Sequence, residues 1–503
     1  MSSRPVAAVP GQRTAPVIVG VAQATWRGGD APDPIEMCAE VVGAAARDAG
    51  AGDALLRRAG SLGVVDIASR RWNDPGALVA ARLGIAPRET LRTALGGDGP
   101  QVLLSDVATR IAGGSLDAAV VCGAEALATL ATAMKDQREP DWPALDPDAA
   151  PTRVLGSDRP PATDAEVAAS LIAPIVMYPL FESVLWARRG DTLAAHRARL
   201  GELWARYAAV AERNPHAWWE GVAPSAERIA TPAPDNRLVT QPYTKLLNSN
   251  IQTDQAAALI VCSAELAREL GIDRGRWVHV HAAGHAYDHW FVSEREDLAA
   301  SPAIRHAAQG ALGAAGVTID DIAHLDVYSC FPSAVQVACR ELGIDPWTDA
   351  REPTVTGGLT FAGGPGNNYV THAIAAMVQR LRDDPGTLGL TTAVGWYLTK
   401  HAVGLFGTDP PAAPFTAVNA QAAVDGTPRR ATATGVAGAA TGEACSIVYD
   451  RDGAPTVAAI TALLDDGRRA VASSGDPALL AALDDEPLAG RALRLDGSGA
   501  FAL

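Results

Sequence analysis

The chain has 503 residues, of which 48% are hydrophobic and 20% charged, and its formal net charge is −15 at pH 7. This composition excludes a disordered chain, and the length exceeds what one hydrophobic core usually organises. The negative charge argues against sequence-unspecific nucleic-acid binding, which needs cations to neutralise phosphates. We therefore expect a globular protein with two or more cores.

Targeting segments, membrane spans and cysteine pairs in a sequence indicate where a protein is located. Its first twenty residues contain no basic stretch followed by a long apolar run, and no segment approaches the roughly 20 apolar residues of a membrane span. The six cysteines are dispersed, so neither a disulfide framework nor a zinc site is indicated. We expect a cytoplasmic protein without membrane contact.

The first part of the chain alternates between short apolar runs and segments with helical periodicity. The predicted strands are 15–23, 61–69 and 116–126, and the predicted helices are 33–50, 74–85 and 100–114. A repeated β-α-β order predicts a largely parallel sheet covered by helices on both faces.

This alternation stops after residue 133, where proline clusters surround a few helical pieces. We interpret 134–245 as an inserted subdomain, after which a strand and a helix at 254–272 complete the first core. A second series of strands and helices follows in the same order. Both series contain a glycine turn, a helix, a short turn and a strand, so an internal duplication is predicted.

After Pro414 the sequence changes to short alternating runs. Asp-Gly pairs at 452–453 and 466–467 predict β-hairpins. The predicted domains are 15–133 with 246–272, the insertion 134–245, a second α/β half 273–415, and a β-rich domain 416–503.

The segments "SNIQTDQAAALIV", "VYSCFPSAVQ", "AGGPGNNYVTHAIA" and "WYLTKHAVGLFG" resemble the thiolase superfamily, and the resemblance covers roughly residues 15–415. They are most similar to the thiolase-like protein type 1 branch, which carries an additional C-terminal domain. The resemblance implies an α/β protein with a duplicated thiolase fold. Two βαβαβαββ halves would form α-β-α-β-α layers, with an inserted loop domain and a small β-rich C-terminal domain.

The resemblance also assigns the catalytic positions, and none of them keeps its usual residue. Thiolases use a nucleophilic Cys, a His that activates it, a second Cys that moves a proton, and an Asn beside the substrate. Those positions fall on Asp98, Gly364, Ala393 and Tyr328. Ordinary thiolysis is therefore not expected. Asp98, in a turn expected to be exposed, is predicted to cap the helix that follows it.

An enzymatic alternative stays open. Cys330 falls where sterol-carrier-protein-linked thiolases have an acid–base Cys, so acyl transfer or carbon–carbon cleavage through its thiol is one interpretation. A buried structural Cys is the other. His372 or His401 would have to be the base, although a lone histidine is more often structural. Lys400 is either an anion-binding residue or an ordinary surface lysine.

The ligand implied by the resemblance is coenzyme A or an acyl-coenzyme A, and no cofactor is required. Arg188 and Arg189 begin a basic segment that would contact the phosphates, unless it is a solvated helix face. The other expected contacts come from the acyl-side loop and from a glycine turn that opens a helix. They are Asn248, Asn250, Gly363, Asn367 and Asn368.

Four histidines between residues 279 and 289 raise a metal hypothesis, but no carboxylates or thiols stand at ligand spacing beside them, so no metal is expected. We expect Trp290 and Phe291 to pack over a pocket instead. The expected partner is a small molecule, whereas nucleic acid and membrane are not expected. A homodimer stays open, and so does a role as a non-catalytic partner subunit in lipid metabolism.

Overall fold

The computed structural model describes residues 13–483 and 486–503. Residues 1–12 lie outside these ranges, and with them lies most of the N-terminal segment in which the sequence has no basic stretch followed by a long apolar run. In the described part of the chain, no helix is both long enough and apolar enough to cross a membrane.

The main sheet has 11 strands, and its core is formed by two sets that come from the two halves of the sequence. The strands are β1 (Pro16–Thr25), β2 (Ser61–Val64), β3 (Glu89–Thr93), β4 (Ala118–Ala126), β5 (Arg153–Leu155), β8 (Asp254–Ser263), β9 (Val278–Tyr287), β10 (Ile322–Asp326), β11 (Leu388–Gly395), β12 (Lys400–Gly407) and β13 (Thr416–Asn419).

The strand order confirms the predicted duplication. The first half runs β2-β4-β8-β1, and the second runs β10-β11-β12-β9. In both halves the first pair is parallel and the next two pairs are antiparallel. The half-sheets meet where β1 and β9 share two antiparallel residue pairs. Strands β3 and β5 extend the first half beyond β2.

The expectation of a largely parallel sheet is wrong, because the sheet is mixed. A parallel neighbour requires a long crossover connection. Strand β12 instead follows β11 after the short turn 396–399 and therefore returns antiparallel. Strand β8 is likewise antiparallel to both β4 and β1.

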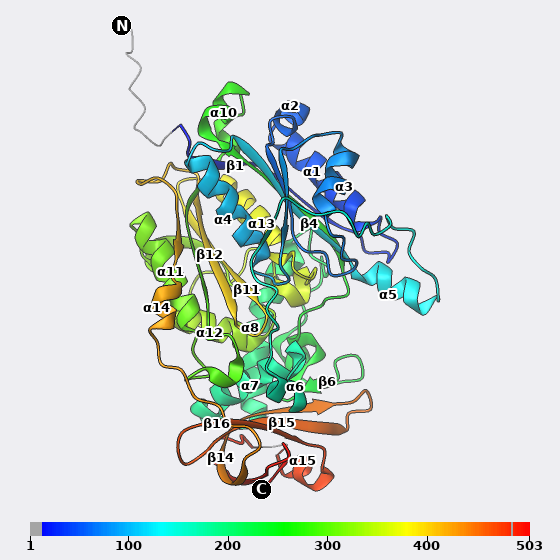
Figure 1. The fold of residues 1–503 in the computed structure, drawn as a ribbon, viewed down its shortest axis with the longest axis vertical. Helices are drawn as coiled ribbons and strands as arrows, with labels where there is room; N and C mark the ends of the chain where they lie inside the picture. Colours follow the sequence, from blue (N-terminus) through cyan, green and yellow to red (C-terminus); the bar gives the residue numbers. More distant parts are fainter. Residues whose placement is uncertain (1–12, 484–485) are drawn as a thin grey trace.

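The helices of the core form three layers around the two half-sheets, which gives the predicted α-β-α-β-α order. Helices α4 and α13 pack against each other and against strands of both halves, so they form the central layer (Figure 1). Helix α1 covers the outer face of the first half, and α11 covers the second. The helices are α1 (Pro34–Asp48), α2 (Gly52–Leu56), α3 (Pro75–Leu83), α4 (Gly99–Ala112), α10 (Ala264–Glu269), α11 (Pro302–Ala315), α12 (Pro332–Leu342) and α13 (Tyr369–Asp383).

The segment between β4 and β8 forms a mainly helical subdomain. Its elements are α5 (Leu127–Lys135), α6 (Asp164–Ala168), α7 (Pro174–Arg189), α8 (Leu193–Arg213), α9 (Ala226–Ala230), β6 (Leu238–Thr240), β7 (Tyr243–Thr244) and the 3₁₀ turn η1 (Lys245–Leu247). Strand β5 leaves this subdomain and pairs with β3 of the main sheet.

The C-terminal residues form a separate antiparallel sheet, as predicted. Its strands are β14 (Ala437–Tyr449), β15 (Pro455–Leu463), β16 (Arg469–Ser474), β17 (Ala492–Asp496) and β18 (Phe501–Ala502), and helix α15 (Pro477–Leu483) packs against them. Helix α14 (Gln421–Asp425), which precedes this sheet in the chain, packs on β9 and α11 of the core instead. Both predicted hairpins exist, because β15 is antiparallel to β14 and to β16. Strand β6 of the insertion also pairs with β14, so the two regions share this sheet.

Candidate functional site

Asp98 lies at the amino end of α4, but it is not the exposed helix cap that the sequence predicts. Its side chain is only 3% exposed and accepts no capping hydrogen bond. Burial raises the pKa of this carboxyl group to about 6, and the positive charge of Lys400 offsets part of that increase. The amino end of α4 therefore holds a buried carboxyl group.

Lys400 begins β12 and is also buried, so it is not an ordinary surface lysine. Its ammonium group donates hydrogen bonds to the carbonyl oxygens of Leu95 and Ser157, both at 2.6 Å. Burial lowers the pKa of Lys400, whereas nearby carboxylates, Asp98 first among them, oppose this shift. The Trp290 ring covers the ammonium group at 6.0 Å.

Tyr328, Ala393 and Gly364, the other positions that the resemblance assigns to catalysis, are also tightly packed. A Cβ atom at Gly97 would overlap the Tyr328 hydroxyl, so this tyrosine fills the space beside the glycine turn. Ala393 is 1% exposed in β11. The backbone N–H of Gly364 donates to the carbonyl oxygen of Asn250 at 2.8 Å. Each of these positions is therefore part of the packed interior, and Tyr328 is the one shown to lie beside the turn of Asp98.

Cys330 follows β10, which is an edge strand of the sheet rather than a central one. Its backbone carbonyl accepts a hydrogen bond from Ser249 at 3.1 Å, which places it next to the acyl-side loop. Burial raises the pKa of the Cys330 thiol to about 12, and the neighbouring Tyr178 hydroxyl counteracts this only in part. The thiol is therefore protonated at neutral pH.

Neither histidine is arranged as a base for Cys330. His372 shares a hydrogen bond of 3.1 Å with Gln23, and burial lowers its pKa to about 3. His401 alternates with Lys400 along β12 and contacts Ser301 at 3.4 Å, and burial lowers its pKa to about 4. Among the described residues, no hydrogen bond joins either imidazole to Cys330.

A cavity of about 900 Å³ opens between α5 and η1. Three cations from distant parts of the sequence line it: Lys135, Lys245 and Arg451. The lining contains no carboxylate, and in the described residues none of the three cations forms an ion pair. The volume lies within the range of small-molecule sites, about 300–1,000 Å³.

The walls of this cavity are fixed by buried hydrogen bonds. Asp254 holds the amino end of α5, because its carboxylate accepts from the N–H groups of Ala128 at 2.9 Å and Thr129 at 3.0 Å. Trp218 and Trp219 form another wall, and their N–H groups donate to the π-helical turn η5 (Gly358–Ala362). The cavity is thus supported by rigid elements.

Two of the predicted ligand contacts, Asn248 and Asn250, line the cavity. The Asn248 amide donates to Thr244 at 2.7 Å, and its carbonyl Oδ1 has no donor in the described part of the chain. Asn250 and Ser249 connect the cavity wall to Gly364 and Cys330 through the backbone hydrogen bonds described above. The cavity wall is therefore connected to the segments that carry Gly364 and Cys330.

The other predicted contacts do not line it. Asn367 donates to the carbonyl oxygen of Asp66 at 2.9 Å, and Asn368 donates to that of Gly123 at 2.7 Å. Gly363 has φ +113° and packs against Gln255, where a Cβ atom would overlap the amide oxygen. Through these three residues, the glycine turn that precedes α13 contacts the first half of the structure.

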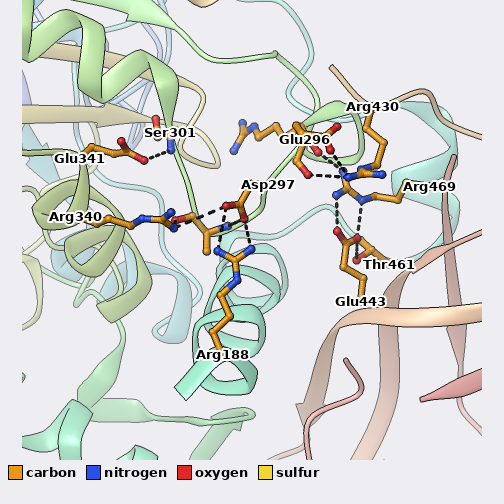
Figure 2. A network of polar contacts seen from close by, with 12 residues as sticks. Arg188, Glu296, Asp297, Ser301, Arg340, Glu341, Arg430, Glu443, Thr461 and Arg469 are labelled. Atoms are coloured by element: carbon orange, nitrogen blue, oxygen red, sulfur yellow. Dashed lines mark hydrogen bonds and ion pairs between the residues drawn. The ribbon is translucent and has the colours of Figure 1, made fainter. Parts of the chain in front are cut away.

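Arg188 and Arg189 also lie outside the cavity lining and already have partners. Arg188 makes a two-pronged contact with Asp297, at 2.7 and 3.0 Å, and Arg340 contacts the same carboxylate at 3.8 Å (Figure 2). Arg189 donates to Gln336 and stacks on Trp347 at 4.3 Å. The basic segment ties the insertion to the second half, so it is not a freely solvated helix face.

The histidine-rich strand β9 does not gather metal ligands, and in the described ranges no three His, Cys, Asp or Glu side chains form a metal-binding group. His281 bonds to the carbonyl oxygen of Asp409 at 2.9 Å, and His289 contacts Thr427 at 3.1 Å. Trp290 is 7% exposed and covers Lys400, while Arg159 stacks on Phe291 at 4.6 Å.

Sequence reasoning missed the three cations of the cavity. One signal was available, since Lys135 and Lys245 are two of only three lysines in the chain. Arg451, however, is one of many arginines and belongs to a different domain. Its place beside the lysines follows from tertiary contacts alone.

The duplicated half-sheets, the two central helices and the glycine turns at their amino ends define a thiolase-fold protein. The dimeric peroxisomal thiolase of Saccharomyces cerevisiae shares this fold, with a TM-score of 0.55 and 14% identity over 79% of this chain and 98% of that one. Residues 284–365 match the thiolase C-terminal domain-like family, and residues 419–499 match the thiolase-like protein type 1 additional C-terminal domain.

A second solved structure is similar over nearly the whole chain. It is a monomeric SCP2-thiolase like protein type 1 from Mycobacterium smegmatis, with 31% identity, a TM-score of 0.83, and coverage of 98% of this chain and 99% of that one. The chain belongs to the thiolase-like protein type 1 family.

The match to a curated enzyme is more limited. An acetyl-CoA acetyltransferase of Methanocaldococcus jannaschii is 30% identical over 99 residues, which is 20% of this chain. The chain thus matches about a quarter, 25%, of the length of that enzyme.

Proposed function

We propose that this protein binds coenzyme A or an acyl-coenzyme A in the cavity lined by Lys135 and Lys245, and that it does not catalyse ordinary thiolysis. The observation that carries the proposal is the charge of the residues that line the cavity. Cations without carboxylates line it, although the chain has a net charge of −15. Such a lining attracts an anionic ligand, because a cleft of one charge sign concentrates counter-ions.

The other end of the cavity supports a thioester ligand. Asn250 and Ser249 connect it to Gly364 and Cys330, beside the positions that react with acyl groups in thiolases. The walls are mixed, since Trp218, Trp219 and Leu246 are apolar and Asn248 is polar. A long, partly apolar arm that ends in a thiol or thioester fits this lining.

The loss of thiolysis is supported by the residues at the four degenerate positions. A protonated carboxyl group or a weakly nucleophilic carboxylate at Asp98 cannot replace a thiolate. Gly364 and Ala393 have no group that transfers protons, and Tyr328 fills the space beside Gly97. The Cys330 alternative has less support, because its thiol has a pKa of about 12 and neither proposed histidine contacts it.

The proposal is tested by calorimetric titration of the full chain with coenzyme A and acetyl-coenzyme A, followed by an acetoacetyl-coenzyme A cleavage assay. We expect binding that weakens at high salt and cleavage no faster than the no-enzyme control. Lys245→Glu should weaken binding about tenfold or more, whereas Lys400→Met tests whether a buried lysine outside the cavity matters. Absence of binding, or turnover at several per second, would overturn the proposal.

A further inference from the structure

The cavity contains one residue from the C-terminal domain. Arg451 begins the turn between β14 and β15, and among the described residues that line the cavity it alone lies beyond Thr360 in the sequence. The turn is internally fixed, because the Asp450 carboxylate accepts from the N–H groups of Asp452 and Ala454, both at 2.9 Å. Arg451 is therefore presented on an ordered turn.

Strand β14, which leads into this turn, pairs with β6, a strand that lies just before Lys245 in the chain. Val448 pairs with Thr240 of β6, and the N–H of Gln241 donates to Ile447 at 2.9 Å. Lys245 follows β6 and β7 within a few residues. The two cations on this side of the cavity are therefore positioned by neighbouring strands of one sheet.

A buried arginine fixes the same domain to the body of the protein. Arg469 is 0% exposed, and its guanidinium binds both carboxylate oxygens of Glu443, at 2.5 and 2.6 Å (Figure 2). Its other nitrogen donates to the carbonyl oxygens of Ser293 and Arg295 in the core. This contact holds the C-terminal sheet, and with it the 450–454 turn, in one position.

We propose that the C-terminal domain completes the ligand cavity, and that Arg451 joins Lys135 and Lys245 in binding the phosphate groups of a nucleotide-bearing ligand. The three cations line one cavity whose lining contains no carboxylate, so a polyanion would gain charge-assisted contacts there. This inference rests on the proposed function and adds to it a specificity-determining residue outside the thiolase-fold body.

The test compares Arg451→Ala with Arg494→Ala in calorimetric titrations of the full chain. Arg494 is an exposed arginine of the same domain, on β17, and does not line the cavity. The probes are coenzyme A and pantetheine, which lacks the phosphates and the nucleotide. We expect Arg451→Ala to weaken coenzyme A binding about tenfold and to leave pantetheine binding unchanged. Arg494→Ala should change neither.

The outcomes separate this inference from the proposed function. If the wild-type chain binds neither probe, the proposed function fails and the inference fails with it. If it binds coenzyme A and Arg451→Ala binds equally well, the inference alone is overturned. Equal weakening of both probes by Arg451→Ala also overturns it, because the arginine would then act through the fold rather than through phosphates. An unchanged urea unfolding midpoint confirms that the variant is folded.

Discussion

Lys400 and Asp98 face each other across Gly96 and Gly395, and both side chains are buried. Lys400 is 1% exposed and Asp98 is 3% exposed. A Cβ atom on either glycine would overlap the Asp98 carboxylate and approach Lys400 to within 3.1–3.3 Å. Four residues from two distant segments therefore form one tightly packed unit at the amino end of α4.

Asp98→Asn should flatten the pH dependence of stability. The pKa of Asp98 is raised from 3.8 to about 6 in the folded protein, so folding favours its protonated form. Asp98 contributes its full stabilisation below pH 4. As the pH rises from 4 through 6, the free energy of unfolding loses this contribution of about 3 kcal/mol. Urea unfolding of both proteins between pH 4 and 8 measures this. Glu125, whose pKa is raised to about 7, also titrates in this pH range, but it is present in both the wild-type protein and the variant. Equal slopes of stability against pH in the two proteins would contradict the prediction.

Gly395→Ala should lower the free energy of unfolding by about 1–3 kcal/mol, the usual cost of overpacking. The added methyl group would overlap the Asp98 carboxylate, and Lys400 leaves it no room to move. Gly313→Ala in α11 is the matched control, because nothing lies within 4 Å of a Cβ atom there. It should be neutral or stabilising by up to about 1 kcal/mol. Urea midpoints compare the two variants, and similar values would refute the packing argument.

Cys330 should resist iodoacetamide at pH 8. With a pKa of about 12, only a very small fraction of the thiol is ionised, and the reagent must reach a buried sulfur. Peptide mass spectrometry should find alkylation at Cys330 only after unfolding in urea. Rapid labelling in the native protein, suppressed by coenzyme A, would instead support the enzymatic alternative.

Arg469→Met should destabilise the protein by about 3–5 kcal/mol, because Glu443 and two core carbonyl groups lose their buried partner. Arg468→Ala is the neighbouring control. Arg468 is about half exposed and forms an ion pair with the equally exposed Asp466, so its removal should cost less than about 0.5–1 kcal/mol. Differential scanning calorimetry distinguishes them, and equal transition temperatures would contradict the role of Arg469 in docking.

The chain should sediment as a monomer. Strand β5 covers the edge of β3 that would otherwise be open for pairing with a second copy. Arg153 fixes β5 through two hydrogen bonds to Asp106, at 2.7 and 3.0 Å. Sedimentation velocity over a wide concentration range measures the state of the protein. A stable dimer at micromolar concentration would show that another surface mediates association.

The sequence predicted those parts of the fold that depend on local patterns. Strands β1 and β4 are continuous apolar runs, and α1 begins at Asp33, whose carboxylate accepts from the N–H groups of Ile35 and Glu36. Strand β3, with the sequence Glu89-Thr-Leu-Arg-Thr93, was missed because only Leu91 among its five residues is apolar, so neither an apolar run nor an alternation is present. Periodicity identifies strands with an apolar run or alternation more readily than mainly polar strands such as this one.

The candidate site was predicted less completely, because its decisive contacts are long-range. Asp98 was expected to be exposed from its turn context, and its burial depends on Lys400 about three hundred residues later. The basic segment at Arg188 was visible, but its partner Asp297 was not. Composition indicates where charges occur in a sequence, whereas tertiary contacts decide which of them remain available for a ligand.

The pairing of Val448 with Thr240 also affects how the chain is synthesised. Strand β6 emerges from the ribosome about two hundred residues before β14, an interval of roughly 10–40 s at typical rates of translation. During that time the β6 and β7 strands of the insertion lack their permanent neighbour and present an open hydrogen-bonding edge. A chain ending near residue 415 would keep that edge open permanently, so we expect such a truncated product to aggregate rather than to behave as an isolated thiolase-fold body.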